Sequence, residues 1–169
     1  MHTEFRKAQP AREMRSLLAF DRKVFPASDR FTADYWKELE TYWMLIDGVK
    51  VGCCAFEENT DFHEDGVHAQ LKGSLYIATT GILPRLRGLG LGTMLKYWEI
   101  CYARRHRFGR IVTNMRASNT TIIQLNKKLG FKKIRTIPHY YSGPEDSTVV
   151  MDLLLPGPSQ NSICDPSAP

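Results

Sequence analysis

The chain has 169 residues, of which 43% are hydrophobic and 24% are charged, and it carries a formal net charge of +5. This composition is typical of a soluble globular protein with a sizeable core. No apolar run is long enough to cross a bilayer and no signal-peptide pattern is present, so we expect a cytoplasmic location without membrane association. The basic residues are dispersed along the chain, so no nucleic acid is expected as a partner.

Apolar periodicity predicts the secondary structure in chain order. A short edge strand is followed by two helices, a hairpin, a central strand, a helix, a strand, another helix and two closing strands. The corresponding ranges are residues 3–7, 10–25, 32–40, 42–56, 74–78, 90–106, 110–115, 120–129, 131–138 and 148–155. We therefore predict an α/β fold with a mixed, largely antiparallel central sheet and helices on both faces, in a single domain spanning residues 1–155.

Local signals support several of these boundaries. Asp47-Gly48 lies between two apolar runs, which is typical of a hairpin turn. Thr32 and Asn119 are suitable N-caps for two of the helices, and Gly130 is a suitable residue to end one.

Three polar stretches lie outside the predicted elements. Residues 57–73 and 139–147 are expected to be loops, and residues 156–169 are expected to be a disordered C-terminal tail. His63 and His68 lie near carboxylates in the first of these loops. Their spacing matches no helical metal pair, so no metal site is expected.

The cysteines have no Cys-x-x-Cys spacing. They are Cys53, Cys54, Cys101 and Cys164. Cys53 and Cys54 are neighbours on a predicted strand and therefore point to opposite faces of the sheet. We expect reduced, structural thiols.

A glycine-rich stretch over residues 79–93 joins the central strand to the next helix. Gly88, Gly90 and Gly92 leave the backbone bare there. Backbone N–H groups can then converge on an anion at the helix N-terminus, where the helix dipole adds partial positive charge. The neighbouring Arg87 adds a full charge. The pattern predicts a phosphate or pyrophosphate site, with a turn that binds no ligand as the alternative.

Two common phosphate loops do not fit this stretch. The nucleoside-triphosphate loop requires Lys-Ser/Thr after its last glycine, whereas Gly92 is followed by Thr93-Met94. In the dinucleotide fingerprint the third glycine comes one residue later than it does here, and an acidic residue follows about 20 residues on. Neither requirement is met.

The loop resembles the Arg/Gln-x-x-Gly-x-Gly/Ala loop of the GNAT N-acetyltransferase superfamily, with Arg87, Gly90 and Gly92 at the three positions. A second stretch resembles that family's Arg-x-x-Asn, helix and Leu-Gly-Phe motif. It runs from Arg116 and Asn119 through residues 129–131. The order of elements over residues 4–155 is also similar to the GNAT fold.

The resemblance implies direct transfer of acetyl from acetyl-coenzyme A, as cosubstrate, to a primary amine of a small molecule or a protein. Backbone groups of the strand end would pair with the pantetheine arm, the glycine loop would hold the pyrophosphate, and an asparagine side chain would meet the pantetheine. The implied cofactor-binding residues are Gly81, Ile82, Leu83, Arg87, Gly88, Leu89, Gly90, Leu91, Gly92, Thr93 and Asn119. Asn119 also suits a helix cap, and Arg116 a structural salt bridge.

The chemistry needs an oxyanion donor, a base and an acid, since an amine attacks a thioester only when neutral. By analogy, the backbone N–H of Ile82 is the oxyanion donor. The family often has a tyrosine acid and a glutamate base at positions that are Asn126 and Asn114 here. Tyr141 as acid and Glu57 as a base through water are our candidate replacements. Tyr140, Tyr76 and Glu58 are further candidates.

Two alternatives follow from the two asparagines. The domain either positions its substrates and lets the thiolate leave unassisted, or binds acetyl-coenzyme A as a sensor or structural ligand without turnover. A basic nucleic-acid-binding module is a third and weaker hypothesis. The acceptor site is expected among residues 29–42, 57–73 and 139–147, but the sequence does not identify the amine. Whether the chain forms a homodimer is left open.

Overall fold

The computed structural model describes residues 2–62 and 68–155. Its strands are β1 Thr3–Lys7, β2 Glu40–Ile46, β3 Val49–Phe62, β4 His68–Ile82, β5 Arg110–Arg116, β6 Lys132–Tyr141 and β7 Asp146–Leu154. Its helices are α1 Pro10–Val24, α2 Ala33–Glu38, α3 Leu91–Arg105 and α4 Thr120–Lys128, with short 3-10 turns at Ala27–Asp29 and Pro84–Leu86.

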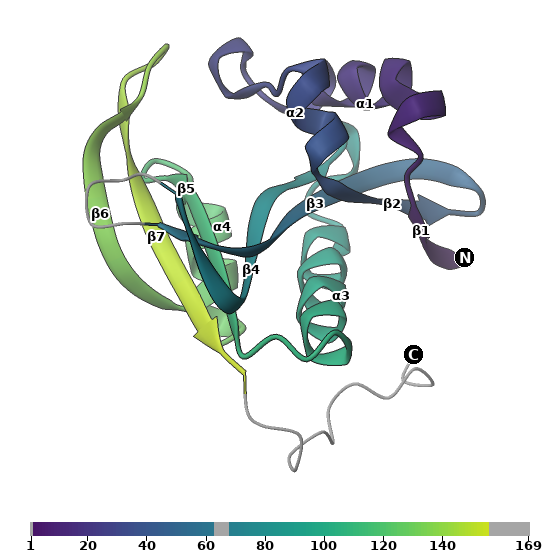
Figure 1. Ribbon diagram of the computed structural model, residues 1–169. Helices are drawn as coiled ribbons and strands as arrows, with labels where there is room; N and C mark the ends of the chain where they lie inside the picture. Colours follow the sequence, from purple (N-terminus) through teal and green to yellow (C-terminus); the bar gives the residue numbers. More distant parts are fainter. Residues whose placement is uncertain (1, 63–67, 156–169) are drawn as a thin grey trace.

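The seven strands form one sheet in the order β1-β2-β3-β4-β5-β7-β6. Every neighbouring pair is antiparallel except β4 and β5. The α1 and α2 helices cover one face of the sheet, and α3 and α4 cover the other (Figure 1). The predicted mixed α/β architecture, with a largely antiparallel sheet between helices, is confirmed.

Two apolar cores lie on the two faces of the sheet. One packs Leu17 of α1 and Trp36 of α2 against Cys53 on β3. The other packs Leu95 of α3 against the next residue of the same strand, Cys54. The two thiols are buried, form no disulfide and point to opposite faces, as the alternation of a strand requires.

The helix caps agree with the sequence prediction. Thr32 Oγ1 accepts a hydrogen bond from the Tyr35 N–H at 3.2 Å at the start of α2. Asn119 Oδ1 accepts from the Ile122 N–H at 3.3 Å at the start of α4. Both side chains satisfy a backbone donor that the first helical turn leaves without a partner.

The predicted loop over residues 57–73 is wrong over most of its length. β3 continues to Phe62 and β4 starts at His68, so the two strands extend as a hairpin. The extended parts of both strands contain many polar residues, so they lack the apolar alternation by which a strand is recognised in a sequence. Thr60 and Asp61 are buried there, and Arg110 of β5 forms an ion pair with Asp61. His63 lies outside the described residues, and so does the predicted tail.

The closing strands also reach further than predicted. β6 runs to Tyr141 and β7 begins at Asp146, which leaves residues 142–145 as the turn. The predicted strand ended at Pro138, whereas β6 continues past it; β6 is the last strand of the sheet, where a missing N–H donor is tolerated. The register also shifts between Ile137 and Tyr141. The longer β6 includes Tyr140 and Tyr141, which line the cavity described below.

Candidate active site

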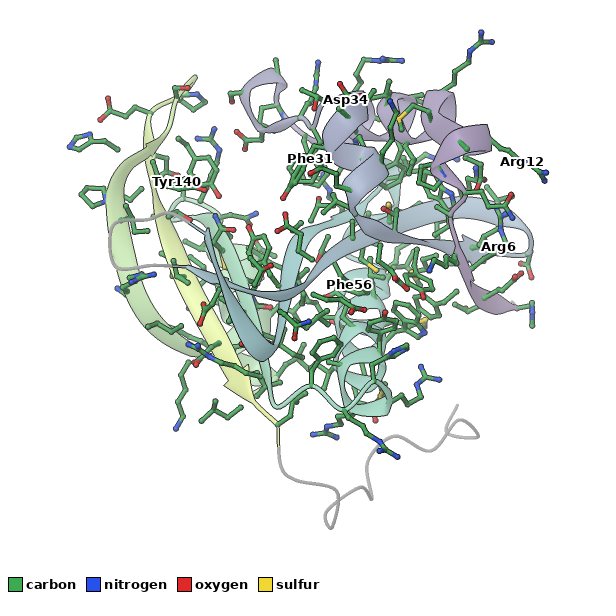
Figure 2. The ribbon with its side chains drawn as sticks, in the orientation of Figure 1. Arg6, Arg12, Phe31, Asp34, Phe56 and Tyr140 are labelled. Atoms are coloured by element: carbon green, nitrogen blue, oxygen red, sulfur yellow. The ribbon has the colours of Figure 1, made fainter. Side chains whose placement is uncertain are left out.

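A cavity of about 490 Å³ lies where β4 and β5 separate. The two strands pair only from Ser74 to Ile77 on β4, opposite Arg110 to Thr113 on β5, and then diverge. Figure 2 shows Phe31 and Tyr140 on opposing sides of this space. The lining residues are Phe25, Ser28, Asp29, Arg30, Phe31, Tyr35, Tyr76, Ile77, Ala78, Thr79, Thr80, Lys96, Thr113, Asn114, Met115, Arg116, Asn119, Ile122, Tyr140, Tyr141 and Ser142. They come from elements on both faces, so the cavity passes through the sheet.

One side of the cavity is covered by a bridge between the α1–α2 segment and the β6–β7 turn. Arg116 at the end of β5 donates to both carboxylate oxygens of Asp29, at 2.6 and 2.7 Å. It also donates to the Pro144 carbonyl at 2.7 Å. Ser28 Oγ donates to the Gly143 carbonyl at 3.0 Å. The salt-bridging role predicted for Arg116 is confirmed, and we call this set of contacts the Arg116 bridge.

The end of β4 has one edge without a neighbouring strand. The Leu83 N–H donates to the Val51 carbonyl of β3 at 3.0 Å, and the Leu83 carbonyl accepts from Leu86 at 2.9 Å. Both backbone groups of Leu83 are therefore used within the protein. Because successive residues of a strand point their N–H groups to opposite edges, the N–H of Ile82 faces the open edge, toward β5. The N–H of Gly81 faces β3, so the N–H groups on the open edge are those of Ile82 and its alternate neighbour Thr80. The pantetheine contacts of Gly81, Ile82 and Leu83 stay a prediction.

Gly81 has a separate structural role. A Cβ atom at this position would lie 2.8 Å from Val24 Cγ1 and 3.1 Å from Phe25 Cζ. The glycine therefore lets the C-terminal end of α1 approach the strand that lines the cavity.

The glycine loop presents free backbone donors at the start of α3. Gly88 and Gly90 have φ angles of +80° and +79°, which favour glycine. Gly90 is the N-cap of α3 and has no side chain, so the first N–H groups of the helix lack the partner that a capping side chain would supply. A Cβ atom at Gly88, Gly90 or Gly92 would meet no atom within 4 Å. This cradle can hold a pyrophosphate.

The side chain of Arg87 points away from that cradle. Its guanidinium donates to the Val24 carbonyl at 3.1 Å and to the Ile82 carbonyl at 3.3 Å. The residue therefore ties the end of β4 to the end of α1, and the loop can supply its anion site through backbone groups.

A polar network occupies the wall formed by β4, β5 and β6. Tyr76 Oη donates to Asn114 Oδ1 at 2.6 Å. Asn114 Nδ2 lies 3.1 Å from Tyr141 Oη and 3.0 Å from Thr148 Oγ1. The Arg116 guanidinium lies over the Tyr141 ring, 4.4 Å from its centroid. Asn114 therefore fixes the positions of two tyrosine hydroxyls.

These tyrosines are neutral at physiological pH. Burial raises the pKa of Tyr141 to about 12, and burial together with the neighbouring tyrosines raises the pKa of Tyr76 well above its usual value. Burial and the hydrogen bond to Glu57 raise the pKa of Tyr35. Neutral phenols donate hydrogen bonds and accept them weakly, so this wall is suited to orienting an amine and passing protons.

Glu57 does not line the cavity. It is half-buried on β3 and accepts a hydrogen bond from Tyr35 Oη. Tyr35 does line the cavity, so the Tyr35 hydroxyl lies between the cavity and Glu57. The carboxylate itself lines a second cavity of about 590 Å³ beside Glu38 and Glu58. The candidate base is thus connected to the cavity indirectly.

Asn126 is also separate from the cavity. It is fully buried, and its Nδ2 lies 3.6 Å from Met115 Sδ and 4.0 Å from Met151 Sδ. Its Oδ1 has no hydrogen-bond partner among the described residues. It is therefore a core residue and takes no part in chemistry within the cavity.

The structure adds two cavity residues that the sequence did not single out, Ser28 and Lys96, and gives Asp29, which lies in the expected acceptor range 29–42, a specific role. Ser28 and Asp29 belong to the Arg116 bridge, and nothing local in the sequence signals contacts over more than 80 positions. Lys96 lines the cavity from α3. The sequence does indicate an ion pair at this position, because Lys96 and Glu99 are three residues apart within an otherwise apolar helical stripe.

Comparisons with known proteins assign the family. Residues 11–131 match the sequence profile of the acetyltransferase (GNAT) family. The chain therefore belongs to this family, and it is an acetyl-coenzyme A-dependent N-acetyltransferase. None of the helices in the described ranges is long and apolar enough to span a membrane.

Three known proteins are similar to this chain. N-alpha-acetyltransferase 50 of Danio rerio is 29% identical over 164 residues, covering 92% of this chain and 86% of that protein. The ribosomal-protein-S18-alanine N-acetyltransferase of Escherichia coli has a similar fold, with a TM-score of 0.76, 13% identity and coverage of 95% and 98%. Arabidopsis thaliana Naa50 in complex with the bisubstrate analogue CoA-Ac-MVNAL gives a TM-score of 0.71, 22% identity and coverage of 92% and 100%.

Proposed function

We propose that this enzyme transfers acetyl from acetyl-coenzyme A to the free α-amino group of a polypeptide. The observation that carries the proposal is the weak basicity of the cavity. Among the described residues that line it, the only carboxylate is Asp29, which is held by Arg116, and there is no histidine. The acceptor must therefore lose its proton easily.

The basicity of the acceptor decides between two kinds of protein amine. An α-amino group has a pKa of about 7.8 and a lysine side chain about 10.4. At pH 7.4, roughly a quarter of α-amino groups are neutral, against about one lysine in a thousand. A cavity whose lining offers no histidine and no carboxylate apart from the paired Asp29 favours the α-amino group. The names of the Danio rerio and Escherichia coli proteins, and the peptide portion of the Arabidopsis thaliana analogue, agree with this choice.

The residues present fit acetyl-coenzyme A. The glycine loop offers backbone donors without side chains in front of them, and the open edge of β4 offers the Ile82 N–H. In this arrangement residues 87–93 would hold the pyrophosphate, and Asn119, which lines the cavity, would contact the pantetheine. The cosubstrate supplies the activated acetyl thioester.

The protein's own groups would then assist the attack in three ways. The Ile82 N–H stabilises negative charge on the carbonyl oxygen. Tyr76 and Tyr141, held by Asn114, orient the amine by hydrogen bonds. The proton released by the amine passes through water and the Tyr35 hydroxyl toward Glu57.

The test is a peptide panel with purified protein and acetyl-coenzyme A. Peptides of one sequence would carry a free α-amine, a blocked α-amine, or a blocked α-amine with an internal lysine. We expect kcat/KM for the free α-amine to exceed that for the lysine peptide by at least 100-fold. Equal rates on both peptides would refute the α-amine assignment. Binding of acetyl-coenzyme A without coenzyme A release on any amine would favour a ligand-binding domain without turnover.

A matched pair of variants tests the loop. Gly90→Glu places a carboxylate in the cradle, and we expect it to abolish acetyl-coenzyme A binding measured by calorimetry. Gly48→Glu in the β2–β3 turn is the control, because Gly48 has a φ of +80° and the same open space. Equal loss of binding in both variants would show that backbone strain, rather than blocking of the loop, is responsible.

A further inference from the structure

A buried ion pair lies at the cavity wall on the α3 side. Lys96 Nζ and Glu99 Oε2 are 2.9 Å apart, and the side chains are 2% and 0% exposed. Thr80 Oγ1, from the β4 segment at the cavity, donates to Glu99 Oε1 at 2.6 Å. Lys96 and Thr80 both line the cavity. The pair therefore joins α3 to the strand that borders the gap in the sheet.

Lys96 is distinct from the other cations that line the cavity. Arg116 is bound by Asp29 and the Pro144 carbonyl. Arg30 donates to the Phe25 carbonyl at 3.0 Å and to a second carbonyl of α1. Both arginines lie on the α1–α2 side of the sheet. Among the described residues, Lys96 is the only cavity-lining cation that comes from the α3–α4 side.

The α3–α4 side is where negative charge would develop on the leaving sulfur. The glycine loop and Asn119 would place the arm of coenzyme A on this face, while the tyrosines that would bind the amine lie across the sheet. Asn126 of α4 cannot donate a proton to the sulfur, and it is buried against two methionines. Thr79, Thr80 and Thr113 also line the cavity, but a hydrogen bond from a neutral hydroxyl stabilises an anion less than a charged ammonium does.

We propose that the Lys96 ammonium stabilises the departing thiolate of coenzyme A. This inference rests on the proposed function. As the amine nitrogen forms its bond to the acetyl carbon, the carbon–sulfur bond breaks and its electron pair goes to sulfur. The charge of the Lys96 ammonium stabilises the thiolate that forms. The acceptor ammonium gives up two protons in the reaction: one neutralises the thiolate, so that coenzyme A leaves as the thiol, and the other is released.

Glu99 and Thr80 position the ammonium. Burial raises the pKa of Glu99, and the charge of Lys96 and the Thr80 hydroxyl oppose that rise. Cys54 on β3 also interacts electrostatically with Lys96 and Glu99, and burial raises the pKa of this thiol well above its usual value, so it stays neutral. Glu99 therefore holds the ammonium in place at the wall.

The ion pair can be replaced without leaving a single buried charge. Removing one partner of a buried pair is strongly destabilising, whereas replacing both is often tolerated. The test therefore uses Lys96→Met together with Glu99→Gln, which keeps an oxygen for Thr80. The control is Lys37→Met with Asp34→Asn, which removes an exposed pair of the same spacing on α2.

The first readout is the ionisation of the thiol in bound coenzyme A, followed by the ultraviolet absorbance of the thiolate as the pH is raised. In wild type and control we expect the bound thiol to titrate at least one pH unit below a free thiol, which titrates at about 8.5. In the Lys96/Glu99 double variant we expect that shift to vanish. The same titration in all three proteins would overturn the proposal.

The second readout is turnover. We expect kcat to fall about 100-fold in the folded double variant, with the affinity for acetyl-coenzyme A unchanged within a few-fold. Lys96→Arg, which keeps a cation, should retain part of kcat. Unchanged kcat in the double variant would make the pair purely structural and overturn the proposal. A wild-type protein that lowers the pKa of the thiol in bound coenzyme A but acetylates no amine would contradict the proposed function and support the placement of Lys96 at the sulfur.

Discussion

The Arg116 bridge should control access of the acceptor, and Arg116→Gln is the change that tests it. The substitution removes both hydrogen bonds to Asp29 and the one to the Pro144 carbonyl. The Arg116 and Asp29 side chains are 13% and 16% exposed, so the pair is largely shielded from water. Breaking such a pair by removing one partner costs about 3 kcal/mol. The bridge should then open roughly 150-fold more often.

Amide hydrogen exchange measures this opening directly. The Phe31 N–H donates to Asp21. The N–H of Ser118, which lies in the turn after Arg116, donates to Asp146 at the start of β7. We expect both amides to exchange faster in the variant, by up to the 150-fold estimate. The KM of the acceptor peptide should rise at least tenfold, while the KM of acetyl-coenzyme A should not change.

The control for this experiment is Arg30→Gln. Arg30 comes from the same wall but donates only to carbonyls of the α1 end in the contacts described. Exchange at Ser118 should match the wild type in this variant. Unchanged exchange at both amides in Arg116→Gln would refute the idea that the bridge closes this side of the cavity.

Three further predictions concern stability. Gly81→Ala should lower the free energy of unfolding by about 1–3 kcal/mol in a denaturant titration, because the added methyl would lie 2.8 and 3.1 Å from side chains at the end of α1. Gly92→Ala is the control and should not lower it, because its methyl meets no atom within 4 Å. Asn126→Leu should raise the melting temperature by a few degrees, because it removes a buried oxygen without a partner among the described residues; a lower value would contradict this. Burial alone would raise the pKa of Glu13, but hydrogen bonds from Lys50 and two further donors outweigh it and lower that pKa to about 2. The stability from Glu13 should therefore be present above about pH 4.5 and be lost as the pH falls toward 2, and Glu13→Gln should flatten the acid limb of the stability curve by about 1 kcal/mol.

The sequence predicted the parts of the fold that local patterns encode. The Asp47-Gly48 turn, the caps Thr32 and Asn119, and the helix after Gly90 all lie where the pattern indicated. Each is decided by residues a few positions apart. Strand length was less predictable, because β3 and β4 extend through polar residues that backbone pairing and the ion pair of Asp61 stabilise.

The site was predictable where it consists of backbone and not where it consists of distant side chains. The glycine loop could be recognised because its function requires the absence of side chains. The connection between Tyr35 and Glu57 spans 22 positions, and that between Arg116 and Asp29 spans 87, so both depend on tertiary structure. Glu57 was identified by residue type alone. Only the tertiary structure shows that the Tyr35 hydroxyl connects Glu57 to the cavity.

The short pairing between β4 and β5 has a consequence for the amount of folded protein. Four residue pairs join the two halves of the sheet, so a ligand that occupies the gap would strengthen the shortest strand pairing of the described sheet. Saturation at 100 times the dissociation constant adds about 2.7 kcal/mol to folding, or several degrees in melting temperature. A cell short of acetyl-coenzyme A would then hold this enzyme closer to its unfolding threshold, where proteases remove it faster. Supply of the acetyl donor would set the abundance of the catalyst as well as its rate.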